Sequence, residues 1–171
     1  MRGAFLLRSE PQSDERGVFW RLFDEDGLQD VDIETKISQV SSVVNSRRGT
    51  IRGLHYQVEP HAEAKTLWCW SGSVYDVLVD IRPHEPTYGQ WFAMELTAAE
   101  HVALHIPRGV AHGYQTLEDG SSLTYLISSP FDADSSRSLR WDDPHLGIEW
   151  PFEVSIISER DRSAAPWPPG P

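Results

Sequence analysis

Short runs of β-branched and aromatic residues recur along the chain, with turn signals between them. Ser71-Gly72 and Asp119-Gly120 are typical of the tight turns that join paired strands. Helical patterns are confined to Asp24–Val31, Thr97–Glu100 and Glu159–Ala164. Because many short strands with so few helices favour a two-layered or closed β structure, the sequence predicts an all-β sandwich or barrel. The predicted strands are Val18–Phe23, Ile37–Val44, Thr50–Tyr56, Lys65–Trp70, Val74–Ile81, Trp91–Leu96, Val102–Ile106, Gly113–Leu117 and Leu123–Ile127.

Nothing in the sequence divides the chain into parts. Its 171 residues have the size of one domain, and they contain neither an internal repeat nor a low-complexity block. We therefore expect a single domain over residues 1–171. Residues 164–171 are rich in proline, which removes hydrogen-bond donors and fixes φ. This segment is expected to be an extended surface tail, with Trp167 as the residue able to dock it.

Charge and hydropathy exclude several classes of partner. The chain carries 26 acidic against 15 basic residues, a formal charge of −11, and a field of that sign opposes nucleic acid and anionic membranes. No apolar run reaches the length of a membrane span, and no signal peptide pattern opens the sequence. We therefore expect a soluble cytoplasmic protein. The net charge still leaves room for a local basic pocket and a small anionic ligand.

Metal ligands are few in this sequence. A single cysteine, Cys69, excludes an internal disulfide framework and a cysteine-rich zinc site, and its place between two tryptophans favours a buried packing role. His112 ends a Pro-x-Gly-x-x-His segment of the form that cupin barrels use to aim a histidine inward. His55 could join it in a metal site, but Gln57 stands where metal cupins usually have a second histidine. We therefore expect no metal.

Two aspartates stand in an otherwise apolar strand. Because successive side chains of a strand point to opposite faces, a strand over Val74–Asp80 places Asp76 and Asp80 on one face with Val74 and Leu78. Carboxylates that face a barrel interior are costly unless they are paired or hydrogen-bonded. An inward orientation would give the barrel a polar site, whereas a bulge or a rotated register would place both carboxylates outside. The sequence leaves both arrangements open.

A series of segments in a fixed order carries a family resemblance. They are Asp14–Phe19, Gly49–Gln57, Lys65, Asp76–Arg82, Pro86–Trp91, Ile106–Tyr114, Tyr125, Trp141–Pro151 and Ile157–Asp161. Together they cover nearly the whole chain, and the pattern resembles the nucleotide-sugar epimerases of the dTDP-4-dehydrorhamnose 3,5-epimerase family. The resemblance implies a cupin-like jelly-roll barrel, usually dimeric, that needs neither a metal nor a cofactor. It also implies epimerisation of a nucleoside-diphosphate 4-keto-6-deoxyhexose at C3, at C5 or at both.

Such a reaction needs only acid–base groups. A C–H bond beside a ketone can be broken when a base lies on one face and the enolate oxygen is stabilised, and inversion then requires a proton donor on the opposite face. The resemblance assigns these roles to four residues. His55 is the base and Asp161 the carboxylate that orients it, while Lys65 stabilises the enolate and Tyr125 is the opposite-face acid.

The diphosphate of such a substrate needs cations. By resemblance, Arg52 and Arg16 hold phosphates, and Arg160 stands where the family commonly has lysine. In this family the N-terminal strand crosses to the neighbouring subunit, so Arg16 and Phe19 are expected to serve the partner's site in a homodimer. The acidic chain is thus predicted to gather Arg16, Arg52, Arg160 and Lys65 at one site.

Other positions that match the family are assigned to the sugar and the nucleotide. Asp76 and His112 either contact the sugar hydroxyls, directly or through neighbouring groups, or are structural, and the sequence leaves this open. Gln39 is expected to bind the nucleotide, but two residues later Ser41 replaces the usual asparagine of a Gln-x-Asn pattern. Arg21 replaces a glutamate that lies near the nucleotide in the family. The base, thymidine or cytidine, therefore stays open.

A further departure concerns the number of carbons inverted. Rhamnose-pathway members carry a second tyrosine six residues beyond the acid, and here that residue is Phe131. The missing hydroxyl favours a C3- or C5-monoepimerase as a hypothesis. A different class of function, a non-catalytic or metal-dependent cupin that binds a small sugar nucleotide, is the alternative. The joint presence of a base, its orienting carboxylate, a cation and an acid favours the enzyme.

Overall fold

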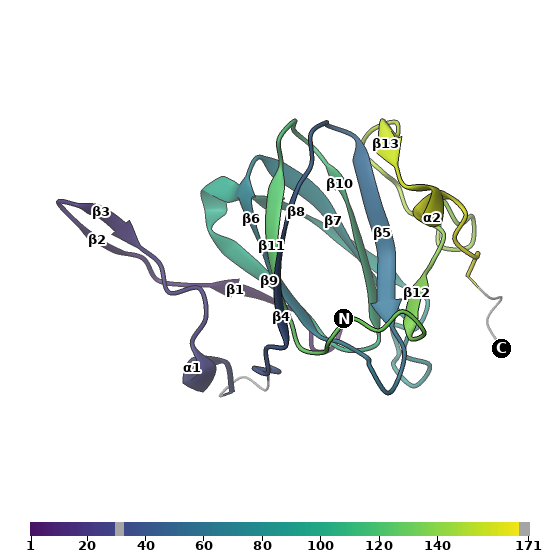
Figure 1. Ribbon diagram of the computed structural model, residues 1–171, viewed down its shortest axis with the longest axis horizontal. Coiled ribbons are helices and arrows are strands. Elements are labelled where there is room, and N and C mark those ends of the chain that lie inside the picture. Colours follow the sequence, from purple (N-terminus) through teal and green to yellow (C-terminus); the bar gives the residue numbers. More distant parts are fainter. Residues whose placement is uncertain (30–32, 168–171) are drawn as a thin grey trace.

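The computed structural model describes residues 1–29 and 33–167, most of which lie in or between β-strands (Figure 1). The helices there are short: α1 (Glu25–Gln29), the 3₁₀ helix η1 (Ala98–Glu100) and α2 (Glu159–Arg162). The strands are β1 (Phe5–Arg8), β2 (Gln12–Asp14), β3 (Gly17–Phe19), β4 (Gln39–Val44), β5 (Thr50–Gln57), β6 (Lys65–Ser71), β7 (Ser73–Asp80), β8 (Trp91–Thr97), β9 (Val102–Ile106), β10 (Val110–Thr116), β11 (Ser122–Ile127), β12 (Ser136–Ser138) and β13 (Ile156–Ile157).

Two sheets form the body of the molecule. The first has the strand order β1-β9-β6-β11-β4, and the second has the order β12-β5-β10-β7-β8 with β13 added beside β5. The pairings are antiparallel except that between β13 and β5. Strands that are distant in sequence are neighbours in both sheets, as in a jelly roll. The predicted all-β, cupin-like fold is therefore confirmed.

The N-terminal segment departs from the predicted strand pattern. The expected strand Val18–Phe23 is reduced to β3, which pairs only with β2 in a separate hairpin. Figure 1 shows this β2–β3 hairpin projecting away from the two sheets. Because β3 pairs with no strand of the main sheets, nothing extends it beyond Phe19. The helix expected over Asp24–Val31 is observed as α1, and residues 30 and 31 lie outside the described residues.

Apolar side chains cover both faces of the second sheet. One cluster fills the space between the two sheets and includes Leu78 of β7, with Leu67 and Leu104 of the facing sheet. A second cluster contains Val77 and Val79 of the same strand. It packs against residues that follow β12, among them Leu139, Leu146 and Trp167. Both faces of β7 are therefore buried, which is why its apolar residues do not simply alternate with polar ones.

The two aspartates of β7 point inward. Asp76 and Asp80 are both fully buried, on the face that β7 turns toward the first sheet. The Nε2 atom of His112 lies 3.0 Å from Asp76 Oδ2, and the guanidinium of Arg82 forms hydrogen bonds to both carboxylate oxygens of Asp80. The inward orientation that the sequence left open is therefore the observed one, and each carboxylate has a partner that offsets the cost of burial.

We expect Asp80→Asn to lower the free energy of unfolding by about 2 kcal/mol at neutral pH, because Arg82 would lose its buried counter-charge. Burial alone would raise the pKa of Asp80, but hydrogen bonds from Arg82 and Thr87 outweigh it and lower the pKa. The stabilisation is therefore present above the pKa of an unfolded aspartate and is lost as pH falls through the lower, folded-state value. Urea unfolding of the wild type and of Asp80→Asn should show that the difference between their free energies of unfolding becomes smaller at acid pH. A difference that stays constant with pH would contradict this account.

Two glycines bring β5 and β10 unusually close together. A Cβ atom on Gly53 would lie 2.5 Å from the Cα of Gly113, and a Cβ on Gly113 would lie 2.7 Å from the carbonyl oxygen of Arg52. The register between the strands shifts here, between the pairs His112–His55 and Tyr114–Arg52. Such an irregularity re-aims neighbouring side chains. It explains why each predicted histidine segment contains a glycine within two residues of its histidine.

The start of the C-terminal tail and Cys69 are placed as the sequence predicts. Trp167 is buried, its backbone N–H donates to Asp143 Oδ2, and its ring packs against Tyr88. The first part of the tail is therefore docked, while residues 168–171 lie outside the described residues. Cys69 is buried, and its burial raises the pKa of the thiol to about 11.

None of the helices in the described part of the chain has the length and apolarity to cross a bilayer.

Candidate active site

A cavity of about 310 Å³ opens between the two sheets and gathers most of the predicted site residues. Strands β5 and β10 form one wall, and strands β4, β6 and β11 form the other. Predicted residues that line it are Gln39, Arg52, His55, Lys65, His112, Tyr125 and Arg160. Asp76 and Asp161 each contact a histidine of this set. Arg16 and Phe19 lie elsewhere, on the β2–β3 hairpin.

A histidine–carboxylate pair lies on the β5 wall. The Nε2 atom of His55 is 2.7 Å from Oδ1 of Asp161, 106 residues further along the chain. About a third of the His55 side chain is exposed (37%), whereas that of Asp161 is almost fully buried. Because a carboxylate accepts the Nε2–H bond, the neutral imidazole keeps its lone pair on Nδ1. This nitrogen is therefore the one that can accept a proton.

Local structure fixes Asp161 in turn. Ser158 caps α2 by accepting a hydrogen bond from the Asp161 backbone N–H at 3.1 Å, and the Gly53 N–H donates to Asp161 Oδ2 at 3.2 Å. Burial alone would raise the pKa of Asp161, but the hydrogen bonds from His55 and Gly53 outweigh it and lower the pKa. Asp161 is thus a stable anion that can orient His55 and stabilise its protonated form.

Lys65 and Tyr125 lie on the opposite wall. In the antiparallel pairing of β6 with β11, Lys65 is opposite Ile127 and Leu67 is opposite Tyr125. Because alternate residues of a strand share a face, all four side chains point to the same side of the sheet. Lys65 and Tyr125 therefore face the cavity from the first sheet, while His55 faces it from the second.

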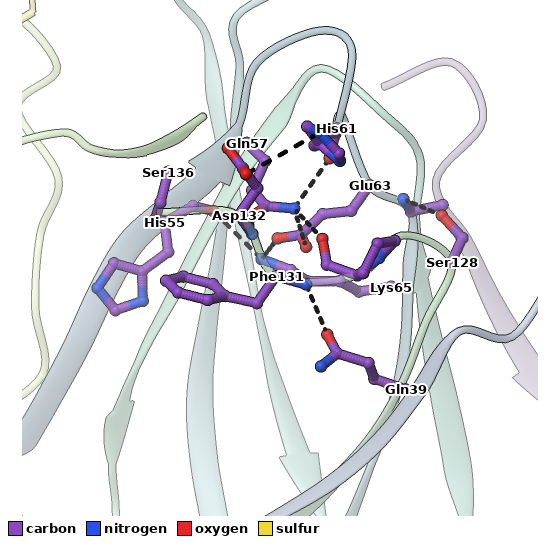
Figure 2. Close-up of polar contacts among 12 residues, drawn as sticks. Gln39, His55, Gln57, His61, Glu63, Lys65, Ser128, Phe131, Asp132 and Ser136 are labelled. Carbon is purple, nitrogen blue, oxygen red and sulfur yellow. Dashed lines mark hydrogen bonds and ion pairs between the residues drawn. The ribbon is translucent and has the colours of Figure 1, made fainter. Parts of the chain in front are cut away.

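Lys65 is held by a network that the sequence did not reveal. Its ammonium lies 2.9 Å from Glu63 Oε1 and donates to the backbone oxygen of His55 at 3.4 Å. Glu63 Oε2 accepts from Gln57 Nε2 at 3.0 Å, and Gln57 Oε1 accepts from the Asp132 N–H at 2.7 Å. Figure 2 shows Gln57 joining the loop that carries Glu63 to the loop that carries Phe131 and Asp132. Gln57 thus acts as a structural bridge.

Tyr125 lies beside a second histidine–carboxylate pair. Its ring is 6.1 Å from that of His112, which contacts buried Asp76. Burial, reinforced by the neighbouring Tyr114 and Asp76, raises the pKa of Tyr125 well above its usual value. Burial also raises the pKa of Asp76 despite the contact with His112. Tyr125 is therefore held as a neutral phenol, a form that can donate a proton.

The two arginines of the cavity are hydrogen-bonded to neutral groups. Arg52 Nε donates to Asn45 Oδ1 at 2.8 Å, and Arg160 Nη2 donates to Ser136 Oγ at 2.7 Å. Elsewhere, Arg82, Arg108 and Arg140 pair with carboxylates. Within the described residues, neither cavity arginine has a carboxylate within ion-pair distance. Their positive charges are therefore available to an anionic ligand.

Three of the four cations predicted to converge do so within one chain. Arg16 is the exception: its side chain is 85% exposed on the β2–β3 hairpin, where it pairs with Asp14. Phe19, on the same hairpin, is 59% exposed and lines a different hollow of about 430 Å³ between the N-terminal segment and Trp68. The hairpin projects from the sheets, so the chain does not bring Arg16 and Phe19 to its own cavity (Figure 1).

The cavity offers no obvious metal site. In residues 1–29 and 33–167, no group of three or more His, Cys, Asp and Glu side chains is placed to hold a metal ion. Instead, His55 contacts Asp161 and His112 contacts Asp76. The side-chain amide of Gln57 forms hydrogen bonds to the two loops that carry Glu63 and Asp132. The residues present therefore fit proton transfer better than metal ligation.

Sequence reasoning missed Glu63, Asn45 and the Tyr114 hydroxyl as parts of the site. Glu63 precedes Lys65 by two residues, and strand periodicity would have placed both on one face. Asn45 and Tyr114 meet through the packing of β10 with the segment after β4, which no local pattern reports. Ser136 likewise reaches Arg160 only through the fold.

Comparison with known proteins agrees with this geometry. The family model described as dTDP-4-dehydrorhamnose 3,5-epimerase matches residues 1–168. An enzyme of that name from Sinorhizobium fredii is 37% identical over 159 residues, which cover 92% of this chain and 82% of that protein. The crystal structure of dTDP-4-dehydrorhamnose 3,5-epimerase from Bacillus anthracis, with TDP and PPi bound, has a TM-score of 0.92 and 34% identity, covering 96% of this chain and 94% of that one.

A second solved structure is also similar. ChmJ, a 3'-monoepimerase from Streptomyces bikiniensis in complex with dTDP-quinovose, has a TM-score of 0.87 and 32% identity, covering 96% of this chain and 83% of that one. The matches in sequence and in structure both extend over nearly the whole chain. The chain therefore belongs to the dTDP-4-dehydrorhamnose 3,5-epimerase family.

Proposed function

We propose that this protein epimerises a dTDP-linked 4-keto-6-deoxyhexose by acid–base chemistry alone. The observation that carries the proposal is the arrangement of His55 with Asp161 on one wall of the cavity and of Lys65 and Tyr125 on the other. Inversion at a carbon requires a base on one face and an acid on the other. Family membership and the TDP-bound relative support the choice of nucleotide.

The reaction begins with His55. Its Nδ1 takes the proton from the carbon beside the ketone, and the electron pair of the C–H bond moves into an enolate whose charge lies on the former keto oxygen. Lys65 stabilises this oxygen as a compact cation. Asp161, buried against His55 Nε2, stabilises the imidazolium that results. This step needs no oxidant, reductant or metal.

Tyr125 completes the inversion. Its hydroxyl gives a proton to the opposite face of the carbon, the enolate collapses to the ketone, and a phenolate remains. The cycle closes when His55 loses a proton to solvent and Tyr125 regains one. Arg52 and Arg160 hold the diphosphate, since their charges have no carboxylate partner among the described residues. We assign Gln39 to the nucleotide, and His112 with Asp76 to the sugar hydroxyls.

Solvent deuterium exchange tests this function. With a dTDP-4-keto-6-deoxyglucose in D2O, we expect NMR to show deuterium entering beside the ketone together with inversion. Metal analysis of the purified protein discriminates the other class, a non-catalytic or metal-dependent cupin. Stoichiometric metal without exchange would contradict the epimerase proposal and support that second class.

We further propose that the enzyme inverts a single carbon, C3 or C5. Phe131 lines the cavity where a second tyrosine is expected in rhamnose-pathway members, so the loop that carries it offers no side-chain hydroxyl at this position. Deuterium uptake resolved by position should be much faster at one carbon, and rapid uptake at both would contradict the proposal.

We propose that the active form is a homodimer in which the β2–β3 hairpin reaches the partner's site. Large apolar side chains are exposed on this hairpin and on the first sheet, among them Phe19 (59%), Val40 (64%) and Val44 (69%). So much exposed apolar surface indicates an interface. In that arrangement Arg16 joins the partner's Arg52 and Arg160, which completes the predicted gathering of cations.

Mixed dimers test the exchange of hairpins. We expect Arg16→Ala and His55→Ala homodimers to be strongly impaired. In a heterodimer purified after co-expression with two tags, one site carries both substitutions and the other carries neither. Activity should therefore return to about half that of the wild-type dimer. If Arg16 serves its own chain, every site carries one substitution and no activity returns.

A further inference from the structure

The hydroxyl of Tyr114 is not used by the proposed reaction, although it lies at the cavity. Tyr114 belongs to β10, is 2% exposed and packs in the core between the sheets. Its hydroxyl donates to Asn45 Oδ1 at 3.3 Å, and the same oxygen accepts from Arg52 Nε at 2.8 Å. Asn45 is buried and is anchored by a hydrogen bond from its Nδ2 to the Ser121 backbone oxygen at 3.0 Å. A polar chain thus connects Arg52 to Tyr114.

The same hydroxyl neighbours Tyr125. Tyr114 and Tyr125 line one cavity, and their rings lie 6.2 and 6.1 Å from that of His112. Tyr125 packs against the core cluster that contains Tyr114. The hydrogen-bonded chain from Arg52 through Asn45 therefore ends at the Tyr114 hydroxyl, and Tyr125 is its neighbour in the cavity.

We propose that Tyr114 is a positioning residue for Tyr125, and that its O–H turns from Asn45 to the Tyr125 phenolate after Tyr125 has donated its proton. This inference rests on the proposed function. Before transfer, Tyr114 donates to Asn45 and its oxygen can accept from Tyr125. After transfer, the O–H points to the phenolate, while Asn45 Oδ1 keeps its bond from Arg52. No buried acceptor is left unpaired, and no proton is gained or lost.

Two features make this hydroxyl important in this chain. Tyr125 is half-buried at the cavity, and its burial raises the pKa of the phenol, so an unsupported phenolate is costly there. Phe131 provides no hydroxyl from the loop beside the cavity. A hydrogen bond to a charged oxygen stabilises it more than one to a neutral group. Tyr114 can therefore supply, from inside the barrel, the support that Phe131 does not give.

Tyr114→Phe isolates the hydroxyl, because the ring still fills its place in the core. We expect inversion to slow by about 10- to 100-fold, while deuterium exchange driven by His55 stays within about twofold of wild type. The ratio of exchange to inversion should therefore rise and KM should stay unchanged. A merely structural role would lower exchange and inversion together. Tyr75→Phe, which removes a phenol beside Trp150 in the outer cluster, is the matched control and should change neither rate.

A double-mutant cycle completes the test. In a Tyr125→Phe background, adding Tyr114→Phe should change the rates by less than about twofold, because the hydroxyl acts through Tyr125. An undiminished effect in that background, or an equal loss of exchange and inversion in the single variant, would overturn the inference. A wild-type protein without exchange would refute the proposed function instead. A wild type that epimerises no faster than Tyr114→Phe would refute this inference alone.

Discussion

Replacement of His55 by alanine is expected to abolish proton exchange and epimerisation, with a loss of at least about 10³-fold, while dTDP binding is largely retained. A general base contributes about 10²- to 10⁴-fold, and here the imidazole also starts the only route to the enolate. Arg52 and Arg160, which we assign to the diphosphate, form hydrogen bonds to Asn45 and Ser136 and not to His55. Exchange followed by NMR and binding followed by calorimetry measure the two properties separately.

A histidine–aspartate pair outside the cavity provides the control for this variant. His145 Nδ1 lies 3.3 Å from Asp143 Oδ1, but the His145 side chain is 64% exposed, and neither residue lines the cavity. His145→Ala should therefore leave exchange and binding unchanged. Residual exchange in His55→Ala close to the wild-type rate would remove His55 from the role of base. Loss of dTDP binding together with exchange would indicate a structural defect and not a chemical one.

The fold was predictable where a strand carries its own pattern. The central strands β5 and β7 are rich in β-branched and aromatic residues, and the sequence predicts both within one residue at each end. It predicts β10 only from Gly113, whereas the strand begins at Val110. Strand β13 has only two residues, and it exists because Ile156 and Ile157 pair in parallel with β5. The stability of such a strand comes from its partner and not from local propensity, so no sequence window reports it. The same holds for β12, which pairs only with β5.

The candidate site shows a similar division. His55 stands out as a reactive residue type in its segment, and the family resemblance added Lys65, Tyr125 and Asp161. Asp161 reaches His55 across 106 residues. Residues that support these groups carry no comparable signal. Asn45 is an ordinary turn residue by sequence and becomes a bridge only because the fold places it beside Arg52 and Tyr114. Such contacts depend on strand register and on a bulge, neither of which follows from composition or spacing.

The orientation of the Asp76 face illustrates why the sequence could not decide between two arrangements. Alternation fixes which residues share a face, but a shift of one residue exchanges the two faces. Both faces of β7 are covered, one by the opposite sheet and the other by residues that follow β12. The valine and leucine side chains of β7 would therefore be buried in either of the two orientations. The deciding factor is pairing, since His112 and Arg82 lie where they can compensate the two carboxylates.

Replacement of Tyr125 by phenylalanine is expected to separate the two halves of the reaction. The variant keeps His55, Asp161 and Lys65, so deuterium should still enter the first carbon that is deprotonated. Net inversion should fall by about 10²- to 10⁴-fold, because the phenol that we assign as the opposite-face acid is removed.

The measurement is NMR in D2O, which reports exchange and inversion on the same substrate. Phenylalanine preserves the ring that packs against the core, so folding should be unaffected. Full epimerisation by the variant would remove Tyr125 from the role of acid. Loss of exchange as well as inversion would mean that Tyr125 already acts before the enolate forms. Retained exchange with lost inversion is the outcome that only a two-wall arrangement predicts, because a single group serving both faces would lose or keep both processes together.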